Sequence, residues 1–346
     1  MMKPRSLTGL LLCLAAAAQA YPRSDLPSAK FQHKDWELAC DNTRTCRAAG
    51  YQPEDQDAPY ASVLLTRRAG PNETVQARLR LAEDPDHPAP AVVTMSIGGK
   101  SYGTVRIDAD TSTGTLSASQ ARALATAVLK DDAITWRAGS TTWTISTAGA
   151  NAVLLRMDEF QGRIDTPDAL ARKGKKPATS VLPALPAPIV QAASLPRSGT
   201  DVAPFTAQQE RALLAALRTT VPDDDCEELA KDGKFEVQRL SGDKLLVSHA
   251  CWQGAYNAGD GYWVINEQAP YSPVLVTTSA SGYVDGVIEA VQRGRGIGDC
   301  MAKLAWTWDG RSFAQTLDAT TGMCRQIAAG GAWDLPTLVA EVRRKK

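Results

Sequence analysis

Histidine is scarce in this chain, and this limits the kinds of active site and metal site to be expected. Only three histidines, His33, His87 and His249, occur among 346 residues. Carboxylates can act as general acids and bases instead, but few histidines argue against hydrolytic triads and histidine-rich metal sites. A basic surplus is also absent, because 38 Lys and Arg balance 38 Asp and Glu. A nucleic-acid-binding protein would carry such a surplus, so we expect no nucleic-acid partner.

Beyond the first twenty residues the chain lacks any hydrophobic run long enough for a transmembrane helix. The first twenty residues have the pattern of an export signal, with basic residues near the start, an apolar segment from Leu7 to Ala18 and a small-x-small site at Ala18-Gln19-Ala20. We therefore expect cleavage after Ala20 and a soluble mature chain that is periplasmic or secreted. Cys13 would be removed with the signal.

The Cys-x-x-Cys spacing of many metal sites is absent as well, although six cysteines remain after the signal. In an exported chain, disulfides are the usual state of such cysteines. Six cysteines allow fifteen connectivities, and the sequence alone does not choose between them. We expect neighbouring cysteines to pair, as Cys40–Cys46, Cys226–Cys251 and Cys300–Cys324. We expect no metal and no other cofactor.

The apolar patterns predict an α+β fold, with two domains dominated by antiparallel sheet and a few short helices. The first domain, residues 21–172, has short strand-like segments and one helix that Ser117 and Gln120 can cap. Two glycines before Lys100 indicate a hairpin turn. Ala152 to Met157 is expected to be a further strand.

A proline- and alanine-rich linker is expected at residues 173–204, because proline neither continues a helix nor donates within a sheet. The second domain, residues 205–346, opens with a helix that Thr206 can cap. Successive strand-like segments with tight turns then predict an antiparallel meander. A final short helix is expected from Asp334.

Three motifs resemble known sites without their full context. Gly99-Lys100-Ser101-Tyr102-Gly103 fits the nucleophile elbow G-x-S-x-G, but a strand follows it where a helix is needed. Gly294, Gly296 and Gly298 lack the dinucleotide-binding spacing and favour a bend between strands, although nearby arginines could line an anion pocket. The acidic run at residues 223–228 lacks the alternation and glycine of a calcium loop, so it favours a solvated face.

Aromatic residues are concentrated in the second half, which holds five of the eight tryptophans. Trp306 and Trp308 alternate along one strand and are expected in the core. Trp252 and Tyr256 lie in a loop-like segment, where flat rings could bind a glycan or a peptide. The candidate binding residues are Trp252, Tyr256, Asp260, Arg295 and Asp299.

Two groups of residues resemble an uncharacterised family of exported proteobacterial proteins. The first group is Phe31 to Trp36, Ala39 to Cys46 and Ala49 to Tyr51, and the second is Arg295 to Cys300, Trp306 to Gly310, Phe313, Cys324-Arg325 and Trp333. The resemblance implies a disulfide-bearing periplasmic protein and supplies no catalytic residues. The first half is similar, more weakly, to invasion-associated locus B proteins through its Trp–Cys start, its β-rich body and the segment from Leu155 to Leu170.

These observations favour a non-enzymatic protein that binds an envelope protein, a glycan or another cell-wall component. We assign no catalytic residue. The alternative is an envelope hydrolase that uses carboxylates, for instance Asp260 with Asp299 or Glu289. A third hypothesis is a structural role through assembly, with the oligomeric state left open. Convergence of Asp260, Asp299, Arg295 and His249 in one cleft would favour the enzyme.

Overall fold

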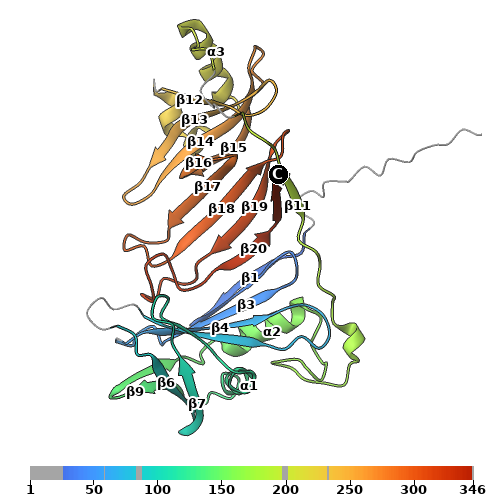
Figure 1. Cartoon of the computed structure of the whole chain (residues 1–346), viewed down its shortest axis with the longest axis vertical. Helices are drawn as coiled ribbons and strands as arrows, with labels where there is room; N and C mark the ends of the chain where they lie inside the picture. The colour runs from blue at the N-terminus through green and yellow to red at the C-terminus, as the bar shows by residue number, and fades with distance from the viewer. Residues whose placement is uncertain (1–25, 58, 83–87, 197–201, 232–233, 345–346) are drawn as a thin grey trace, which may run out of the picture.

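The computed structural model describes residues 26–57, 59–82, 88–196, 202–231 and 234–344 (Figure 1). Within these ranges it consists mainly of antiparallel sheets with three short α-helices, so the predicted α+β class is confirmed. No helix in the described part of the chain is long and apolar enough to cross a membrane. The predicted signal, residues 1–20, lies outside the described residues.

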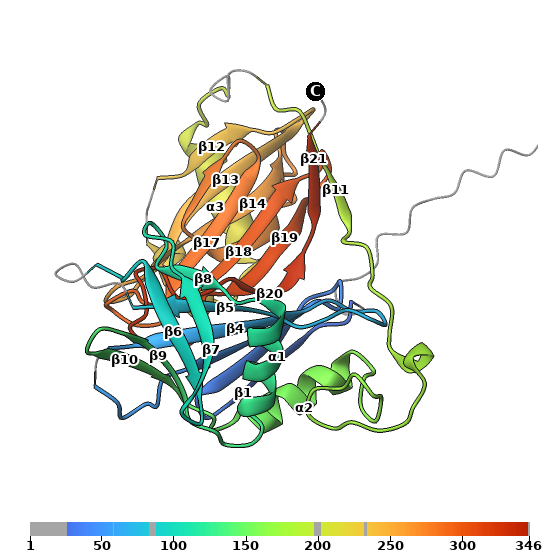
Figure 2. The same ribbon diagram turned by 60° about the horizontal axis from the view of Figure 1, so that its bottom comes forward.

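A six-stranded antiparallel sheet forms the centre of the N-terminal half, by which we mean residues 26–172. Its strands, in sheet order, are β1 (Ala29–His33), β2 (Trp36–Cys40), β3 (Cys46–Tyr51), β4 (Ala61–Arg67), β5 (Gln76–Leu81) and β8 (Thr113–Thr115). A second sheet has the order β10 (Thr141–Ile145), β9 (Ile134–Ala138), β6 (Val92–Ile97) and β7 (Lys100–Arg106). Helices α1 (Ala118–Ala127) and α2 (Ala150–Phe160) complete this half (Figure 2).

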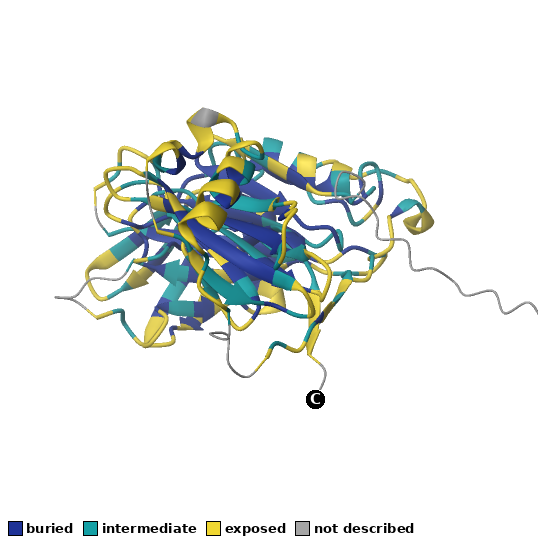
Figure 3. Cartoon of the chain, turned by 90° about the horizontal axis from the view of Figure 1, so that it is seen from above, coloured by how far each residue is buried: buried dark blue, intermediate teal, exposed yellow. Residues whose placement is uncertain are grey.

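Both faces of the six-stranded sheet are buried at its centre. Side chains alternate along a strand, so Leu38 and Val63 enter the main N-terminal core while Ala49 and Leu64 point to the opposite face. That second face is covered by residues 327–335 of the C-terminal half, residues 205–344. Figure 3 shows the buried residues concentrated along the strands.

Two local features predicted for the N-terminal half, a helix cap and a hairpin turn, are confirmed. Ser117 and Gln120 form the predicted capping box of α1. The hairpin β6–β7 turns at Gly98 and Gly99, whose φ values of 53° and 79° suit the glycines of a two-residue turn.

The strand expected at Ala152 to Met157 is wrong, because this segment belongs to helix α2. Its buried residues Val153, Leu154 and Met157 recur at helical spacing, and all three are inaccessible to solvent. A short apolar run is ambiguous between strand and helix, and the helical period decides here.

The C-terminal half contains the predicted antiparallel meander in two sheets. The first sheet runs β12 (Glu236–Arg239), β13 (Lys244–Gln253), β14 (Ala258–Asn266) and β15 (Val274–Ala280). The second runs β16 (Gly282–Val284), β17 (Val287–Arg293), β18 (Met301–Trp308), β19 (Phe313–Thr320) and β20 (Leu335–Val339). Helix α3 (Ala207–Arg218), with the predicted cap at Thr206, packs Leu213 and Leu217 against the first sheet. Trp306 and Trp308 lie in the core between the two sheets, as predicted.

The helix expected from Asp334 is wrong, because this segment forms β20 and then β21 (Glu341–Arg344). Strand β20 pairs with β19 at the edge of the second sheet, where Pro336 is tolerated. Strand β21 pairs in parallel with β11 (Ile189–Ala192), which lies inside the predicted linker. The linker therefore lies along both halves, and its use as a domain boundary stays a prediction.

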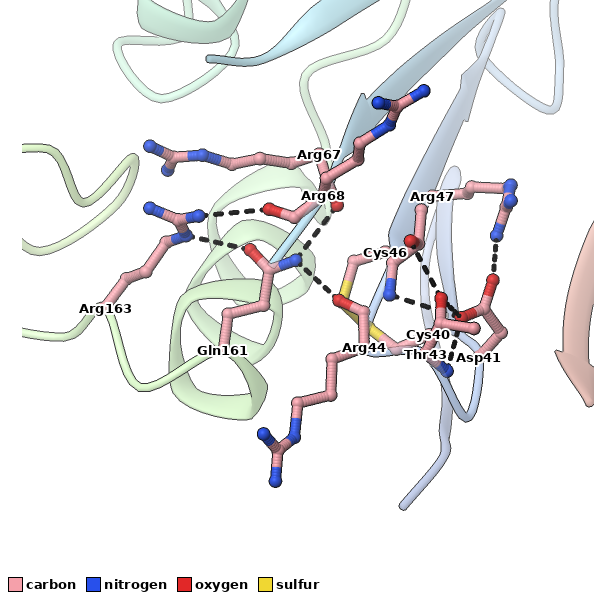
Figure 4. The surroundings of a disulfide bond; sticks show 11 residues. Cys40, Asp41, Thr43, Arg44, Cys46, Arg47, Arg67, Arg68, Gln161 and Arg163 are labelled. Atoms are coloured by element: carbon pink, nitrogen blue, oxygen red, sulfur yellow. Dashed lines mark hydrogen bonds and ion pairs between the residues drawn. A yellow bond between two sulfur atoms is a disulfide. The ribbon is translucent and has the colours of Figure 1, made fainter. Parts of the chain in front are cut away.

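All three predicted disulfides are present: Cys40–Cys46, Cys226–Cys251 and Cys300–Cys324. The first closes the end of the β2–β3 hairpin, which Figure 4 shows with its surroundings. Asp41 accepts from the backbone nitrogen of Thr43 at 2.9 Å, and Gln161 donates to the carbonyl oxygens of Arg44 and Arg67 at 2.9 Å. The end of α2 thus holds the disulfide loop against β4.

Candidate binding site at the junction of the two halves

The two halves meet through an apolar contact centred on Trp333. Its indole Nε1 donates to Ser62 Oγ on β4 at 2.8 Å, and both side chains are buried. Arg78 lies over the Trp333 ring, 5.5 Å from its centroid. Arg80 donates to the carbonyl oxygens of Gly331 and Ala332. Both arginines of β5 therefore contact the C-terminal half.

A second set of contacts in the junction is polar. Tyr51 donates to Glu37 Oε1 at 2.6 Å, and the backbone nitrogen of Met323 donates to the same oxygen at 2.6 Å. Burial raises the pKa of Glu37, and these hydrogen bonds lower it by less. Burial next to Glu37 likewise raises the pKa of Tyr51. The neutral forms of Glu37 and Tyr51 are therefore favoured more strongly at this position than they would be in water.

Asn42 extends this polar contact toward the C-terminus. Its amide nitrogen donates to the carbonyl oxygen of Val339 at 3.0 Å, and its amide oxygen accepts from the Val339 nitrogen at 2.8 Å. The Asn42 side chain thus forms with the backbone of β20 the pair of hydrogen bonds that a neighbouring strand would form. The loop closed by Cys40–Cys46 is in this way tied to the C-terminal half.

Two clefts open along the junction, and the first contains one of the sequence-predicted residues. It measures about 600 Å³ and is walled by residues 88–89 and 109–112 of the N-terminal half. The C-terminal half contributes Ile297, Asp299 and residues 326–329. Clefts between packed units are common ligand sites, so this is a candidate binding site.

Asp299 and Arg295 lie together, as the sequence suggested, but mainly for a structural reason. Arg295 donates to both carboxylate oxygens of Asp299, at 2.8 and 2.6 Å, and the Gln326 nitrogen donates to Oδ2 at 2.7 Å. Burial alone would raise the pKa of Asp299, but these hydrogen bonds lower it below its usual value. Asp299 therefore joins the glycine-rich bend to residues 321–334 between β19 and β20, which we call the junction loop. Its negative charge neutralises Arg295, one of the arginines that could have lined an anion pocket.

Tyr256 lies at the rim of the same region. It occupies the turn between β13 and β14 and is 47% exposed. A Cβ placed on Gly296 would lie 3.7 Å from its ring, so the ring lies against the bend. Asn257 secures this arrangement, because its side chain exchanges hydrogen bonds of 2.8 and 2.9 Å with the backbone of Arg293.

Trp252 does not lie in a loop as predicted, since it belongs to β13 and is only partly exposed. Its ring covers Gly259 on the paired strand, where an added Cβ would lie 2.4 Å from it. The glycine thus makes room for a packed tryptophan. Of the two aromatic candidates, Tyr256 is the one that faces solvent.

Asp260 lies on β14. Burial raises its pKa, a nearby Glu236 raises it further, and His249 lowers it. His249 is 5% exposed, with Nδ1 2.6 Å from the carbonyl oxygen of Ala250. Among the described residues Asp260 interacts with His249 and Arg295 pairs with Asp299, and of these four residues only Asp299 lines the first cleft. The four-residue convergence expected of an enzyme is not found within the described part of the chain.

One group of metal-ligand types gathers in the junction, namely Asp299, Cys300 and Cys324. The two sulfurs are joined in a disulfide, and the carboxylate is already bonded to Arg295 and to the Gln326 nitrogen. The group is therefore a disulfide bond next to an ion pair.

Sequence reasoning missed Glu37 and Arg325 as site residues, as well as Asp35. A signal was available, because Glu37 interrupts the otherwise apolar buried strand Trp36–Cys40. A carboxylate in such a strand needs partners, and Glu37 has one in each half, the Tyr51 hydroxyl and the Met323 nitrogen. The segments that carry the family resemblance also contain Tyr51, Arg325 and Trp333, and they meet at this junction.

Comparisons with known proteins agree with the predicted resemblance. A family model described as "Protein of unknown function (DUF1176)" matches residues 30–340. The chain is 29% identical over 223 residues to the "Uncharacterized protein YpfG" of Escherichia coli (strain K12), which covers 60% of this chain and 62% of that relative. No solved structure matches. The weaker similarity to invasion-associated locus B proteins stays a prediction. Since the match runs through both halves and the junction between them, the chain belongs to the DUF1176 family of proteins of unknown function.

Proposed function

We propose that this protein is an exported, non-enzymatic binding protein for an envelope protein or a cell-wall component. The observation that carries the proposal is an exposed rim beside the first cleft. Ile297 lines the cleft, Arg295 lies two residues before it, and the Tyr256 ring lies against Gly296 between them. Ile297 is 67% exposed, and Tyr256 is 47% exposed on the adjoining turn. An aromatic ring, an arginine and an exposed aliphatic side chain are the residue types that anchor protein interfaces.

Export is supported by the sulfur chemistry. Three disulfides brace the described chain, and such bonds persist in oxidising compartments. The predicted signal at residues 1–20 fits the same location. Mass spectrometry of the mature protein, isolated from a fractionated cell, would test it through the expected start at Tyr21.

Capture experiments test the binding role. The mature chain is immobilised and exposed to periplasmic extract, and separately mixed with sedimented peptidoglycan. We expect Tyr256→Ala and Ile297→Asp each to reduce the captured partner about fivefold or more, the effect of losing an interface anchor worth about 1 kcal/mol. Val284→Asp serves as the matched control, because Val284 is 70% exposed on β16, outside the residues that line the cleft.

Equal capture by the wild type and both rim variants would refute the role of the rim. Absence of any enriched partner across several envelope stresses would refute the binding role itself. The variants change exposed side chains, so circular dichroism should show an unaltered fold in each.

A carboxylate hydrolase is the second candidate, and Asp260 is the residue that favours it. A raised pKa beside Glu236 and His249 is a feature of catalytic acids. Hydrolysis of peptidoglycan or of an ester by the mature chain, with loss of that activity in Asp260→Asn, would establish this role. It would also displace the non-enzymatic proposal.

A further inference from the structure

The second cleft of the junction has a chemistry different from the first. It measures about 560 Å³ and is lined mainly by charged and polar groups. The N-terminal half contributes Lys30, Gln32, Lys34, Glu37 and Glu54, and the C-terminal half contributes Arg325. We propose that this cleft binds a short zwitterionic peptide, with its carboxylate toward Arg325 and Lys30 and its ammonium group toward Glu54.

The first argument is the state of Arg325. Its side chain is 9% exposed, and only its Nη2 forms hydrogen bonds or ion pairs with the described residues. Nη1 is buried without a hydrogen-bond partner in the described part of the structure. An unpaired buried donor costs free energy, and a ligand carboxylate entering from the adjoining cleft would supply the missing acceptor.

The second argument is the pair of lysines at the opening. Lys30 projects from β1 with Gln32 two positions along, so both side chains lie on one face of the strand. Lys34 occupies the turn that follows. Among the described residues neither lysine lies within ion-pair distance of a carboxylate, and Lys30 acts on the nearby Glu37 only enough to lower its pKa, so both ammonium groups can attract an anionic group.

The third argument is the negative charge that lines the same cleft. The Glu54 carboxylate lies 3.8 Å from Arg325 Nη2, yet its side chain is 86% exposed, so it can turn toward a ligand. A multiply charged anion such as phosphate would be repelled by Glu54 and Glu37. A ligand with one charge of each sign matches the two signs of charge in the lining, and the cleft volume suits two or three residues.

This inference does not rest on the proposed function, because it uses the opposite flank of the junction loop and other residues. A protein partner could dock at Tyr256 whether or not this cleft takes a peptide. Failure of one proposal is therefore distinguishable from failure of the other.

Calorimetric titration of the mature chain at low ionic strength tests the inference, with trialanine as the probe. Trialanine should bind saturably. N-acetyl-trialanine, which lacks the ammonium group, and trialanine amide, which lacks the carboxylate, should each bind at least about tenfold more weakly, because each loses a charged hydrogen bond. Inorganic phosphate should bind more weakly than trialanine.

Variants of Lys30 and Glu54 identify which side chain binds the peptide carboxylate and which binds its ammonium group. Lys30→Gln should weaken trialanine and N-acetyl-trialanine but not the amide, whereas Glu54→Gln should weaken trialanine and the amide but not the acetylated peptide. Both residues are exposed, so the fold should persist. Lys100→Gln, an exposed lysine on β7, is the matched control and should leave every affinity unchanged.

Absence of saturable trialanine binding up to about 10 mM would overturn the inference. So would phosphate binding as tight as trialanine, which would indicate a simple anion site. Equal effects of Lys30→Gln and Lys100→Gln would show attraction to overall charge and would overturn it too.

Discussion

Arg325 donates from Nη2 to Oδ1 of Asp35 at 2.8 Å, across 290 positions of sequence. The two side chains are 9% and 12% exposed, so the ion pair is nearly removed from water. The Arg325 carbonyl oxygen also accepts from Gln52 Nε2 at 3.0 Å. One residue of the C-terminal half therefore satisfies two polar groups of the N-terminal half. One half can unfold without leaving a buried, unpaired charge in the other only if the two halves also separate.

Asp35→Ala should destabilise the protein by about 3–5 kcal/mol. The substitution removes the buried partner of Arg325 and leaves its charge only the more distant, exposed carboxylate of Glu54. The midpoint of urea unfolding measures the change.

The control for this variant is Glu341→Ala. Glu341 pairs with Arg343 at 2.7 Å, but both side chains are more than half exposed. Exposed pairs contribute little, so the unfolding midpoint should stay where it is. If Asp35→Ala behaves like this control, the junction ion pair does not hold the halves together.

Gly322→Ala should destabilise more than Gly330→Ala. Both glycines have positive φ, 96° and 78°, so the backbone strain of a side chain is similar at the two positions. Only at Gly322 would the new Cβ meet an atom, the Tyr51 hydroxyl oxygen at 2.2 Å. The clash should add about 1–3 kcal/mol, the usual cost of overpacking, measured as the difference in unfolding free energy.

A double variant isolates that clash. Tyr51→Phe removes the hydroxyl that the Cβ would strike, so Gly322→Ala should cost less in the Tyr51→Phe background than in the wild type. The same penalty in both backgrounds would mean that Tyr51 and Gly322 are not in contact in solution.

The sequence predicts the elements of this fold because their signals are local. The capping pairs Ser117–Gln120 and Thr206–Gln209 sit three residues apart, and the chain around them needs no distant partner to form a helix turn. Cysteine pairing was predictable for the same reason, since all three bridges join neighbours.

Elements that depend on distant residues were predicted wrongly or missed. Pro336 and the apolar residues after Asp334 fit the start of a helix, but β19 supplies a strand partner that sequence cannot reveal. Glu37 and Arg325 acquire their roles only when β2 meets the loop before β20. The candidate site is thus a product of the junction, and a pattern within either half could not define it.

Removal of the long-loop disulfides should cost more than removal of Cys40–Cys46. The bridges Cys226–Cys251 and Cys300–Cys324 span 25 and 24 residues, whereas Cys40–Cys46 spans 6. Chain entropy then gives a loss of about 3.5 kcal/mol for a long loop and about 2 kcal/mol for the short one. Paired Cys→Ser variants and urea unfolding measure the order.

Titration of free thiols provides the control for these variants. The native protein without its predicted signal should show none before reduction, since all six cysteines after residue 20 are paired. Six reactive thiols in native material would contradict both the pairing and the expected compartment.

Glu37→Gln should become more stabilising, relative to the wild type, as the pH rises. Burial raises the pKa of Glu37 above its ordinary value of 4.5. The native state therefore holds this proton more tightly than the unfolded state, so the contribution to stability is complete below about pH 4.5 and is lost as the pH passes the raised value. Glutamine does not ionise and still offers an oxygen to Tyr51 and to the Met323 nitrogen.

The measurement compares unfolding free energies of the two proteins at a series of pH values from about 4 to 8. The difference should be small near pH 4.5, increase in favour of Glu37→Gln through the raised pKa, and then level off. Groups common to both proteins cancel in this difference, which isolates position 37. A difference that is flat, or that moves in favour of the wild type, would show that the Tyr51 and Met323 hydrogen bonds outweigh burial and hold Glu37 as a carboxylate.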